Sequence, residues 1–433
     1  MNSDTILIKG GRVVDPANNI DKVLSVIIKD GKIDKFLSPT EDVKINQMID
    51  ATGQIVCPGL IDMHVHFREP GQEYKETIET GLKAAAKGGF TGVLCMPNTE
   101  PAIDNEGTVH YVASQARRFP YSNLWIAAAV TKGRKGEQMT EMGILKEAGV
   151  KALTDDGAPI ATAGILKKVL QYSSMFDLLI IDHAEDLSLS HGGVMNEGYH
   201  SVIHGLKGIP EMAEDVIVAR DILVSERTGV PIHIAHVSSG GAVDLIEAAQ
   251  KKGVKVTAET APHYTILCDE DVDFDTHKKM NPPLRYRKSV ERIIKGLKDN
   301  VITIIATDHA PHQIMDKHVE FDCAPFGIIG LESSLAVILK SLYHTGILDL
   351  KAVIEKMSLN PARLLRLDRG TLGVGTVADI TIFDLYKEWK MKDTDLESKS
   401  KNCPFLGWDF KGKVTHTLVG GKIVLKNGEI CPV

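Results

Sequence analysis

Cysteine pairs, long apolar runs and an excess of basic residues are all missing from this chain of 433 residues. Its six cysteines are scattered and form no CxxC pair, which argues against a thiolate zinc site and against a disulfide framework. No apolar run approaches the ~20 residues that a membrane-spanning helix needs. The first residues also lack the cationic and apolar regions of a signal peptide. These absences predict a cytoplasmic protein with reduced thiols and no membrane partner.

Basic residues are too few and too dispersed for a nucleic-acid partner. The chain has 50 lysines and arginines against 57 aspartates and glutamates, a formal net charge of −7, and no basic stripe. Phosphate recognition depends on clustered Lys and Arg, so nucleic-acid binding is excluded. The hydrophobic fraction of 43% and the charged fraction of 25% are those of an ordinary globular protein. The length allows a large core and more than one structural unit.

Both ends of the chain read as short strands separated by turns. Residues 5–14 and 23–28 are rich in β-branched side chains, and the second run is followed by the hairpin turn Asp30-Gly31. The same pattern of short apolar runs and turns occurs near the other end, in residues 373–383, 413–419 and 422–425. We therefore predict that the two termini pair into one small β-sandwich domain, formed by residues 1–56 and 365–433.

The middle of the chain, residues 57–364, alternates apolar runs with segments of helical periodicity. The apolar runs are residues 59–65, 92–96, 124–130, 150–153, 178–181, 231–235, 254–258 and 301–306. The helical segments are residues 74–87, 108–118, 139–148, 164–172, 212–228, 242–252, 286–298 and 331–343. This pattern predicts an α/β fold, a (β/α)8 TIM-like barrel. An open doubly wound sheet is disfavoured because no Gly-rich phosphate loop follows a strand.

Histidine and aspartate concentrate where the predicted strands end, and catalytic residues of such barrels lie at those ends. His64 and His66 stand two apart, so on a strand they point to the same face. Later runs end near Asp155, Asp156, His183, His236, His263, Asp308, His309 and His312. Several nitrogen ligands with carboxylates suit zinc, and a second carboxylate could bridge two ions. The pattern predicts a metal centre that hydrolyses amides or related bonds.

Each of these residues also has an ordinary explanation. A single histidine such as His183 is more often a hydrogen-bonded core residue, and Asp308 could cap a helix. His233 and His236 lie three apart and face opposite ways on a strand, so we assign only His236 to the site and predict a structural role for His233. One metal centre explains the set better than independent accidents do, and Asp308 is then the natural general base.

The end of the fourth run leaves a choice between two neighbouring carboxylates. Asp155 and Asp156 cannot share a face of a strand, but alternation does not say which of them faces the barrel axis.

Several motifs carry a resemblance to a known family. They are DMHVHFREPG at 62–71, MPNT at 96–99, NPPLR at 281–285, ATDHAPH at 306–312, APFG at 324–327 and SKSKN at 398–402. The chain resembles the amidohydrolase superfamily and, within it, the dihydroorotases of the longer bacterial type, type I. The likeness covers essentially the whole chain. HFREPG, MPNT and NPPLR together are much more specific than the HxH pair, which marks only the superfamily.

The resemblance implies a zinc-dependent cyclic amidohydrolase that interconverts N-carbamoyl-L-aspartate and L-dihydroorotate in de novo pyrimidine (UMP) biosynthesis. It implies one or two zinc ions and attack by metal-bound hydroxide, with Asp308 as catalytic acid/base. The metal ligands carried over by position are His64, His66, Asp156, His183, His236 and Asp308. The substrate-binding residues carried over are His66, Arg68, Asn98, Asn281, His312, Phe326 and Gly327. The chemistry fits, because an arginine fork matches a carboxylate and asparagine both donates and accepts.

One position departs from the pattern of many amidohydrolases, which bridge two metals with a carboxylated lysine at the end of strand four. Here that place reads Thr154-Asp155-Asp156-Gly157, and Lys151 stands nearer the start of the strand. We predict that Lys151 extends toward the other end of the barrel. The resemblance favours Asp156 as the bridging or second-metal ligand.

Two other functions remain open at this point. The first is a hydantoinase, dihydropyrimidinase or allantoinase on the same scaffold, whose substrates lack the ring carboxylate that Arg68, Asn98 and His312 would hold. The second is a non-catalytic homologue that supports aspartate carbamoyltransferase. Such homologues typically lose metal ligands, whereas all six positions are occupied here. A homodimer and an association with aspartate carbamoyltransferase are candidate partnerships, and residues 310–330 are predicted to form a lid that closes on substrate.

Overall fold

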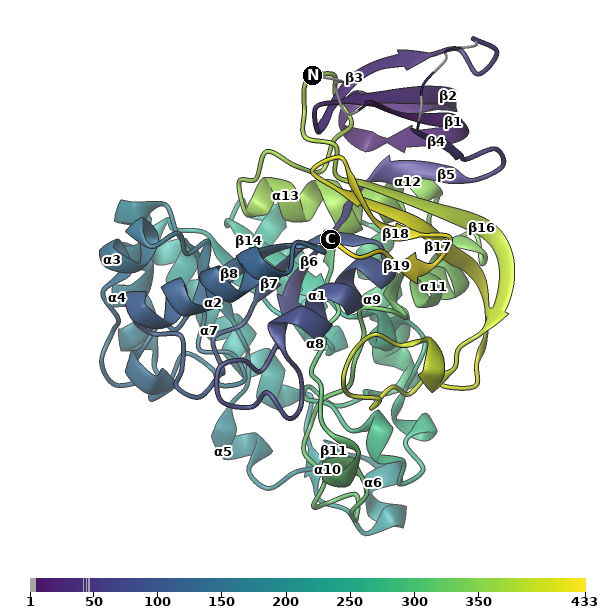
Figure 1. The fold of residues 1–433 in the computed structure, drawn as a ribbon. Coiled ribbons are helices and arrows are strands. Elements are labelled where there is room, and N and C mark those ends of the chain that lie inside the picture. The colour runs from purple at the N-terminus through teal and green to yellow at the C-terminus, as the bar shows by residue number, and fades with distance from the viewer. Residues whose placement is uncertain (1–4, 42, 44, 46) are drawn as a thin grey trace.

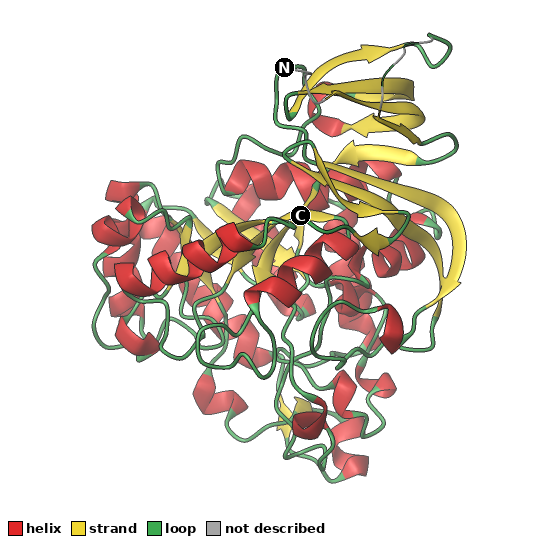
Figure 2. Cartoon of the chain, in the orientation of Figure 1, coloured by secondary structure: helices red, strands yellow, loops and turns green. Residues whose placement is uncertain are grey.

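The two ends of the chain form one sheet, and the middle of the chain forms a barrel beside it (Figures 1 and 2). The computed structural model describes residues 5–41, 43, 45 and 47–433. The strands of the terminal sheet are β1 (Thr5–Asp15), β2 (Ile20–Lys29), β3 (Lys32–Leu37), β4 (Gln47–Asp50), β5 (Ile55–Pro58), β16 (Ile380–Lys390), β17 (Asp409–Val419), β18 (Lys422–Lys426) and β19 (Glu429–Ile430). They lie in the order β19-β18-β17-β16-β5-β1-β2-β3, with β4 paired to β1.

Strand β5 is where the two ends of the chain meet. It pairs antiparallel with β16 and parallel with β1. The far edge of the sheet also returns toward β16, because the Ile33 N–H donates to the Thr376 carbonyl at 2.9 Å and Lys32 bridges to Val377. The sheet therefore curls around a core of its own, which includes Ile8 and Val26. The predicted β domain from both termini is present as one curled sheet.

Eight parallel strands form the barrel predicted for the middle of the chain. They are β6 (Leu60–Val65), β7 (Phe90–Cys95), β8 (Asn123–Ala128), β9 (Ala152–Leu153), β10 (Leu179–Asp182), β13 (Ile232–Ile234), β14 (Val256–Thr260) and β15 (Ile304–Ile305). They follow one another in chain order around the sheet. The last gap is closed by the segment just after β15, where the His66 N–H donates to the His309 carbonyl at 2.8 Å. The expected TIM-like architecture is confirmed.

Helices cover the outside of the barrel at the predicted places, and most of them begin or end a few residues from the predicted bounds. They are α1 (Ile78–Lys87), α2 (Glu106–Arg118), α3 (Met142–Glu147), α4 (Ala163–Ser173), α7 (Met212–Thr228), α8 (Gly240–Lys251), α9 (Arg287–Lys298) and α11 (Ser334–Ile338). Helix α11 continues directly as the π-helical turn Leu339–Tyr343. Two further helices, α12 (Leu350–Ile354) and α13 (Asn360–Leu364), lead toward the terminal sheet. No helix within the described residues is long and apolar enough to cross a membrane.

Long connections at the carboxyl ends of the strands hold small elements that the sequence did not predict. They are α5 (Leu187–Ser190), β11 (Met195–Asn196), α6 (Tyr199–His204), β12 (Gly208–Ile209) and α10 (Ile314–Lys317). Figure 1 shows α5, α6, α10 and β11 together on the side of the barrel away from the terminal sheet. These connections form the rim of the site described next.

Candidate metal centre

Four buried histidines converge at the carboxyl ends of the barrel strands. His64 and His66 come from the end of β6, His183 follows β10 and His236 follows β13. The alternation of β6 places His64 and His66 on one face, as their spacing predicted. Asp156, which follows β9, lies between the two pairs.

Asp156 is shared by two groups of metal-ligating side chains. One group is His64, His66 and Asp156, and the other is Asp156, His183 and His236; within each group the ligand atoms lie within 4.8 Å of one another. Oδ1 of Asp156 lies 3.3 Å from His64 Nε2, 3.3 Å from His236 Nε2 and 3.5 Å from His183 Nδ1. Its Oδ2 lies 3.5 Å from His66 Nε2. One carboxylate thus faces both groups, which is the arrangement that a bridging ligand needs.

Asp155 points away from this cluster. Its carboxylate accepts hydrogen bonds from the Thr131 N–H at 3.0 Å and the Thr131 hydroxyl at 2.6 Å. Lys151 precedes β9, at the opposite end of the strand from Asp156. The choice that alternation left open is therefore made by tertiary contacts, and Asp156 is the residue that reaches the cluster.

The outward nitrogens of three of the histidines are held by hydrogen-bond acceptors. His64 Nδ1 lies 2.9 Å from Glu259 Oε1, His66 Nδ1 lies 2.7 Å from Asn98 Oδ1, and His183 Nε2 lies 3.0 Å from Glu185 Oε2. Each contact orients the ring so that its other nitrogen faces the cluster, where a bound cation would take the place of the proton on that nitrogen. Metal-ligating histidines are held in this way.

The inner atoms fit a divalent cation by two further observations. His64 Nε2 is buried and makes no hydrogen bond within the described part of the chain, although it faces Asp156. Burial opposes ionisation of Asp156, yet the nearby His64 charge and hydrogen bonds from His183 and His236 hold its pKa well below the usual value. Four imidazoles around a carboxylate that stays ionised form a donor set that suits zinc and similar cations, which would displace the protons on the inner nitrogens.

Asp308 completes the cluster on the side of β15. Its Oδ1 lies 3.0 Å from His66 Nε2 and 3.7 Å from His64 Nε2. Burial opposes its ionisation, but the hydrogen bond from His66 and the charges of the surrounding histidines lower its pKa to about 2. Asp308 is therefore ionised, as a metal ligand and a proton acceptor must be.

The backbone is unusual at three residues of the site. Arg68, His236 and Asp308 have φ values of 60°, 33° and 50°, in the left-handed region that side chains with a Cβ seldom adopt. Strain of this kind persists where the surrounding structure holds it, and it gathers at functional sites.

A cavity of about 220 Å³ opens beside the cluster. It is lined by His66, Arg68, Asn98, Asp156, Gly157, His183, His236, Asn281, Asp308, Ala310, His312, Phe326 and Gly327. Every residue predicted to bind substrate is in this set. The structure thus brings all of them to one cavity.

One wall of the cavity carries the groups suited to a carboxylate. Arg68 Nε donates to the Pro311 carbonyl at 3.2 Å, and Arg68 Nη2 lies 3.5 Å from His312 Nε2. Burial lowers the pKa of Arg68 to about 10, so the guanidinium is still charged at neutral pH. Asn98 lines the same cavity and contacts His66.

The predicted contribution of the Phe326–Gly327 backbone needs adjustment. The Gly327 N–H already donates to the Lys279 carbonyl at 2.9 Å, and the Phe326 carbonyl faces His312 Nε2 at 2.8 Å. What these residues offer the cavity is therefore its shape and the remaining carbonyl lone pairs. Asn281 also lines the cavity, and its amide donates to Glu185 at 2.9 Å.

Two supporting carboxylates, Glu259 and Glu185, were not predicted from the sequence, whereas the structural role of His233 was. Glu259, at the end of β14, contacts both His64 and His233 Nε2, the latter at 3.2 Å. His233 also lies 2.8 Å from the Thr257 hydroxyl, so it is a buried supporting residue as predicted. Glu185 supports His183. Both glutamates stand at strand ends, the same signal that identified the histidines.

Comparisons with known proteins identify the family. A family model described as dihydro-orotase-like matches residues 53–242, and one described as the amidohydrolase family matches residues 225–425. Dihydroorotase from Acetivibrio thermocellus is 50% identical over 424 residues, which cover 97% of this chain and 99% of that protein. Dihydroorotase from Geobacter metallireducens is 49% identical over 422 residues, with 97% and 99% covered. The chain belongs to the dihydroorotase family.

Solved structures of hydantoinases share the fold of the chain. The L-hydantoinase (dihydropyrimidinase) from Arthrobacter aurescens superposes with a TM-score of 0.89 at 26% identity, covering 99% of this chain and 97% of that one. A D-hydantoinase superposes with a TM-score of 0.86 at 23% identity, a likeness that concerns the fold alone. As a member of the dihydroorotase family, the chain is an enzyme that hydrolyses cyclic amides of small molecules at a metal-binding site.

Proposed function

We propose that the chain interconverts N-carbamoyl-L-aspartate and L-dihydroorotate at a zinc centre held by His64, His66, Asp156, His183, His236 and Asp308. The observation that carries this proposal is the position of the wall formed by Arg68, Asn98 and His312. It borders the same cavity as the metal-ligating cluster, so a ring carboxylate can be held while the neighbouring amide lies at the cluster.

Asp308 is the proposed catalytic acid/base. A zinc ion held by these side chains would supply the nucleophile, since zinc lowers the pKa of water toward ~7. Asp308 is ionised, lines the cavity and lies against His66. It can accept the proton of the nucleophile and then donate it to the ring nitrogen that leaves. In the reverse direction the same carboxyl takes the proton from the carbamoyl nitrogen.

The number of zinc ions follows from Asp156 in this proposal. Because the Asp156 carboxylate faces both groups of ligating side chains, we favour two ions. Metal analysis per subunit distinguishes one ion from two.

A hydantoinase or dihydropyrimidinase is the second candidate, favoured by the close superposition on the L-hydantoinase. Its substrates carry no ring carboxylate, so a buried Arg68 would face an apolar substituent. A buried charge that loses its partner is costly. The preference between the two substrates therefore depends on Arg68.

The decisive experiment measures metal content together with ring opening and ring closure on dihydroorotate and on 5-substituted hydantoins. We expect zinc to copurify, activity on dihydroorotate in both directions and little activity on the hydantoins. Full activity in metal-free protein would overturn the metal mechanism, and faster turnover of hydantoins would favour the second candidate.

Other proposals concern partners, location and domain limits. We infer a cytoplasmic location, which the six unpaired cysteines support. A homodimer and a complex with aspartate carbamoyltransferase are tested by measuring the mass of the protein alone and mixed with that enzyme. The limits proposed for the terminal domain, residues 1–56 and 365–433, and for the barrel, residues 57–364, are tested by limited proteolysis.

A further inference from the structure

Helix α10 has the reverse of the usual polarity of a surface helix. Its apolar residues Ile314 and Met315 are 71% and 68% exposed, whereas Lys317 is only 3% exposed. An apolar face normally orients such a helix by turning inward. Here the inward residue is a lysine, so the orientation of α10 has another cause.

The cause is a set of hydrogen bonds from the Lys317 ammonium to backbone carbonyls. Lys317 Nζ donates to Pro325 at 2.7 Å, to Thr276 at 3.0 Å and to Lys279 at 3.3 Å. A lysine ammonium has three N–H donors, so all of them are used. The Thr276 hydroxyl returns a hydrogen bond to the Lys317 carbonyl at 2.6 Å.

Lys279 makes the reciprocal contacts from the other loop. Its Nζ donates to the carbonyls of Phe321 at 2.7 Å and Asp322 at 3.0 Å, and it lies 4.8 Å from the centroid of the Phe326 ring. Each lysine therefore binds the main chain of the loop that carries the other. Among the residues that the structure describes, neither ammonium forms a salt bridge, so backbone carbonyls are their direct hydrogen-bond partners.

Both loops end in residues that line the substrate cavity. Lys279 stands two residues before Asn281, and the Pro325 carbonyl held by Lys317 immediately precedes Phe326 and Gly327. The Gly327 N–H donates to the Lys279 carbonyl at 2.9 Å, which joins the two loops at the cavity wall. A change at either ammonium would therefore move the ring side of the cavity.

We propose that Lys279 and Lys317 form a reciprocal clasp that sets the separation of Asn281 from Phe326–Gly327. They are positioning residues, because they act on substrate through these backbone segments and do not touch it. Burial lowers the pKa of Lys317 to about 7. The positive charges of Lys279 and Arg68 contribute to this shift, whereas the negative charges of Asp275 and Asp316 oppose it. Burial of the Lys317 side chain therefore disfavours its protonated form.

The first test is Lys279→Met, which removes one ammonium and leaves Lys317 in place as a trypsin site. In the native protein Lys317 is buried, so trypsin should spare it. In the variant we expect cleavage into fragments 1–317 and 318–433, with metal content unchanged. The matched control is Lys278→Met, since Lys278 forms only a surface pair with Asp275 at 3.8 Å. The control should remain resistant after Lys317.

The second test measures steady-state kinetics on dihydroorotate and rests on the proposed function. Lys279→Met and Lys317→Met should each raise KM about tenfold and change kcat little. The double variant should raise KM no further than the larger single effect, because either change opens the same clasp. Because Lys317→Met removes the trypsin site, loosening of the loop in this variant is measured as the rate at which a glutamate-specific protease cleaves after the exposed Glu320.

Opposite results overturn the clasp and separate it from the proposed function. Rapid tryptic cleavage after Lys317 in the native protein, unchanged proteolysis and KM in both lysine variants, or loss of metal in them would each contradict it. If the lysine variants show the expected proteolysis but the native protein does not act on dihydroorotate, the result supports the clasp and rejects the proposed substrate.

Discussion

Asp156 shows how one side chain can decide the composition of a metal site. The sequence offers two adjacent aspartates, and Thr131 takes one of them while histidines from several strands surround the other. A carboxylate has two oxygens and can bind two cations. The bridging role we propose for Asp156 thus follows from which residue Thr131 binds.

Asp308→Asn tests the acid/base role at the scale of one residue. Asparagine keeps the size and one ligand oxygen but cannot accept and donate a proton in the same way. We expect much of the metal to stay bound and kcat to fall by about 10²- to 10⁴-fold. Metal analysis and turnover of dihydroorotate are the measurements. Native turnover in a fully loaded variant would rule out this role for Asp308.

Arg68→Ala tests the carboxylate wall. The loss of a charged hydrogen-bonding group of this kind costs about 1.5–3 kcal/mol, which is roughly a 10- to 100-fold rise in KM for dihydroorotate. KM for a hydantoin without a ring carboxylate should change little. Equal effects on both substrates would instead mean that Arg68 only supports the fold around Pro311.

The site was largely predictable from residue types at strand ends, and its supporting contacts were not. His64 and His66 follow from period-two alternation, and His236 was separated from His233 by the same rule. Glu259 and Glu185 could not be assigned, because their partners come from other strands and only tertiary structure shows the contact distances. The hydrogen bond from the Gly327 N–H to the Lys279 carbonyl likewise could not be predicted from the sequence.

At the scale of elements, strand β14 supports strand β6 through a single carboxylate. Glu259 contacts His64 of β6 and His233 of β13, so it connects β14 both to its neighbour β13 and to β6, which is not adjacent to it in the sheet. Supporting partners of this kind set the orientation of a metal ligand.

Glu259→Gln should weaken metal binding about 10- to 100-fold, because a neutral amide orients His64 less firmly and makes it a poorer donor. Competition with a chelator measures the affinity without reference to activity. The control is Glu247→Gln, a carboxylate on α8 that pairs with Lys251 and Arg292 away from the site. Equal affinities in the two variants would contradict the supporting role.

Long periodic elements were predicted better than short ones. The bounds of α7 coincide with the predicted 212–228. Strands β9 and β15 are each two residues long, much shorter than the apolar runs that contain them. Most of the flanking residues are buried, and some keep single backbone hydrogen bonds to the next strand, such as the Lys151 N–H to the Ile126 carbonyl at 2.9 Å and the Ala306 N–H to the Thr260 carbonyl at 3.1 Å. The regular ladder is nevertheless only two residues long in each strand, so hydrophobicity overstates the length. Strands β11 and β12 are too short to show alternation at all.

At the scale of the whole molecule, the terminal sheet reaches the catalytic end of the barrel. The Ser398 hydroxyl and the Lys399 N–H donate to Glu76, a carboxylate 3.4 Å from His309. Asn402 accepts a hydrogen bond from the His312 N–H at 3.1 Å and donates to the Gly327 carbonyl at 3.0 Å. A segment assigned by sequence to the terminal domain therefore supports the substrate cavity.

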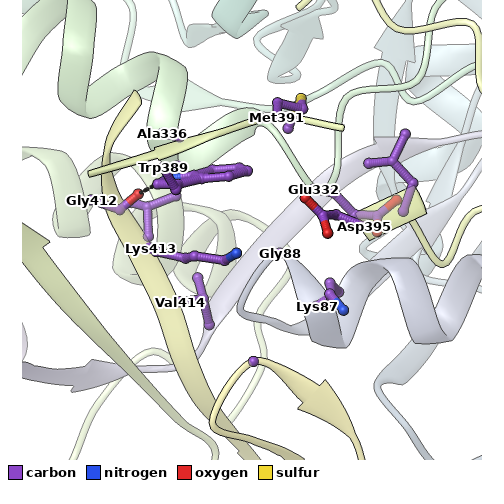
Figure 3. Close-up of a pocket in the computed structure, with 13 residues that line it drawn as sticks. Lys87, Gly88, Glu332, Ala336, Trp389, Met391, Asp395, Gly412, Lys413 and Val414 are labelled. Carbon is purple, nitrogen blue, oxygen red and sulfur yellow. Dashed lines mark hydrogen bonds between the residues drawn. The ribbon is translucent and has the colours of Figure 1, made fainter. Parts of the chain in front are cut away.

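A second cavity, of about 40 Å³, lies where this segment leaves the sheet (Figure 3). Glu332, Trp389 and Lys413 border it, and the Trp389 indole N–H donates to the Gly412 carbonyl at 2.8 Å. The Glu332 carboxyl accepts the N–H groups of Glu397 at 2.7 Å and Ser398 at 3.3 Å. Glu332 thus attaches the segment to the barrel.

Glu332→Gln should reveal a pH-dependent cost at this junction. Burial raises the pKa of Glu332 to about 8 from the usual 4.5, despite the two backbone donors. The folded state therefore binds this proton more tightly than the unfolded state does. The contribution of this proton to the stability of the folded state is complete below pH ~4.5 and is lost as pH rises through 8. Glutamine stays neutral, so the variant should gain stability relative to the native protein between pH 5 and 8, on the order of 2 kcal/mol. Denaturant unfolding at several pH values, with the exposed Glu320→Gln as control, measures the difference. A difference independent of pH would show that Glu332 ionises normally and that the junction carries no such cost.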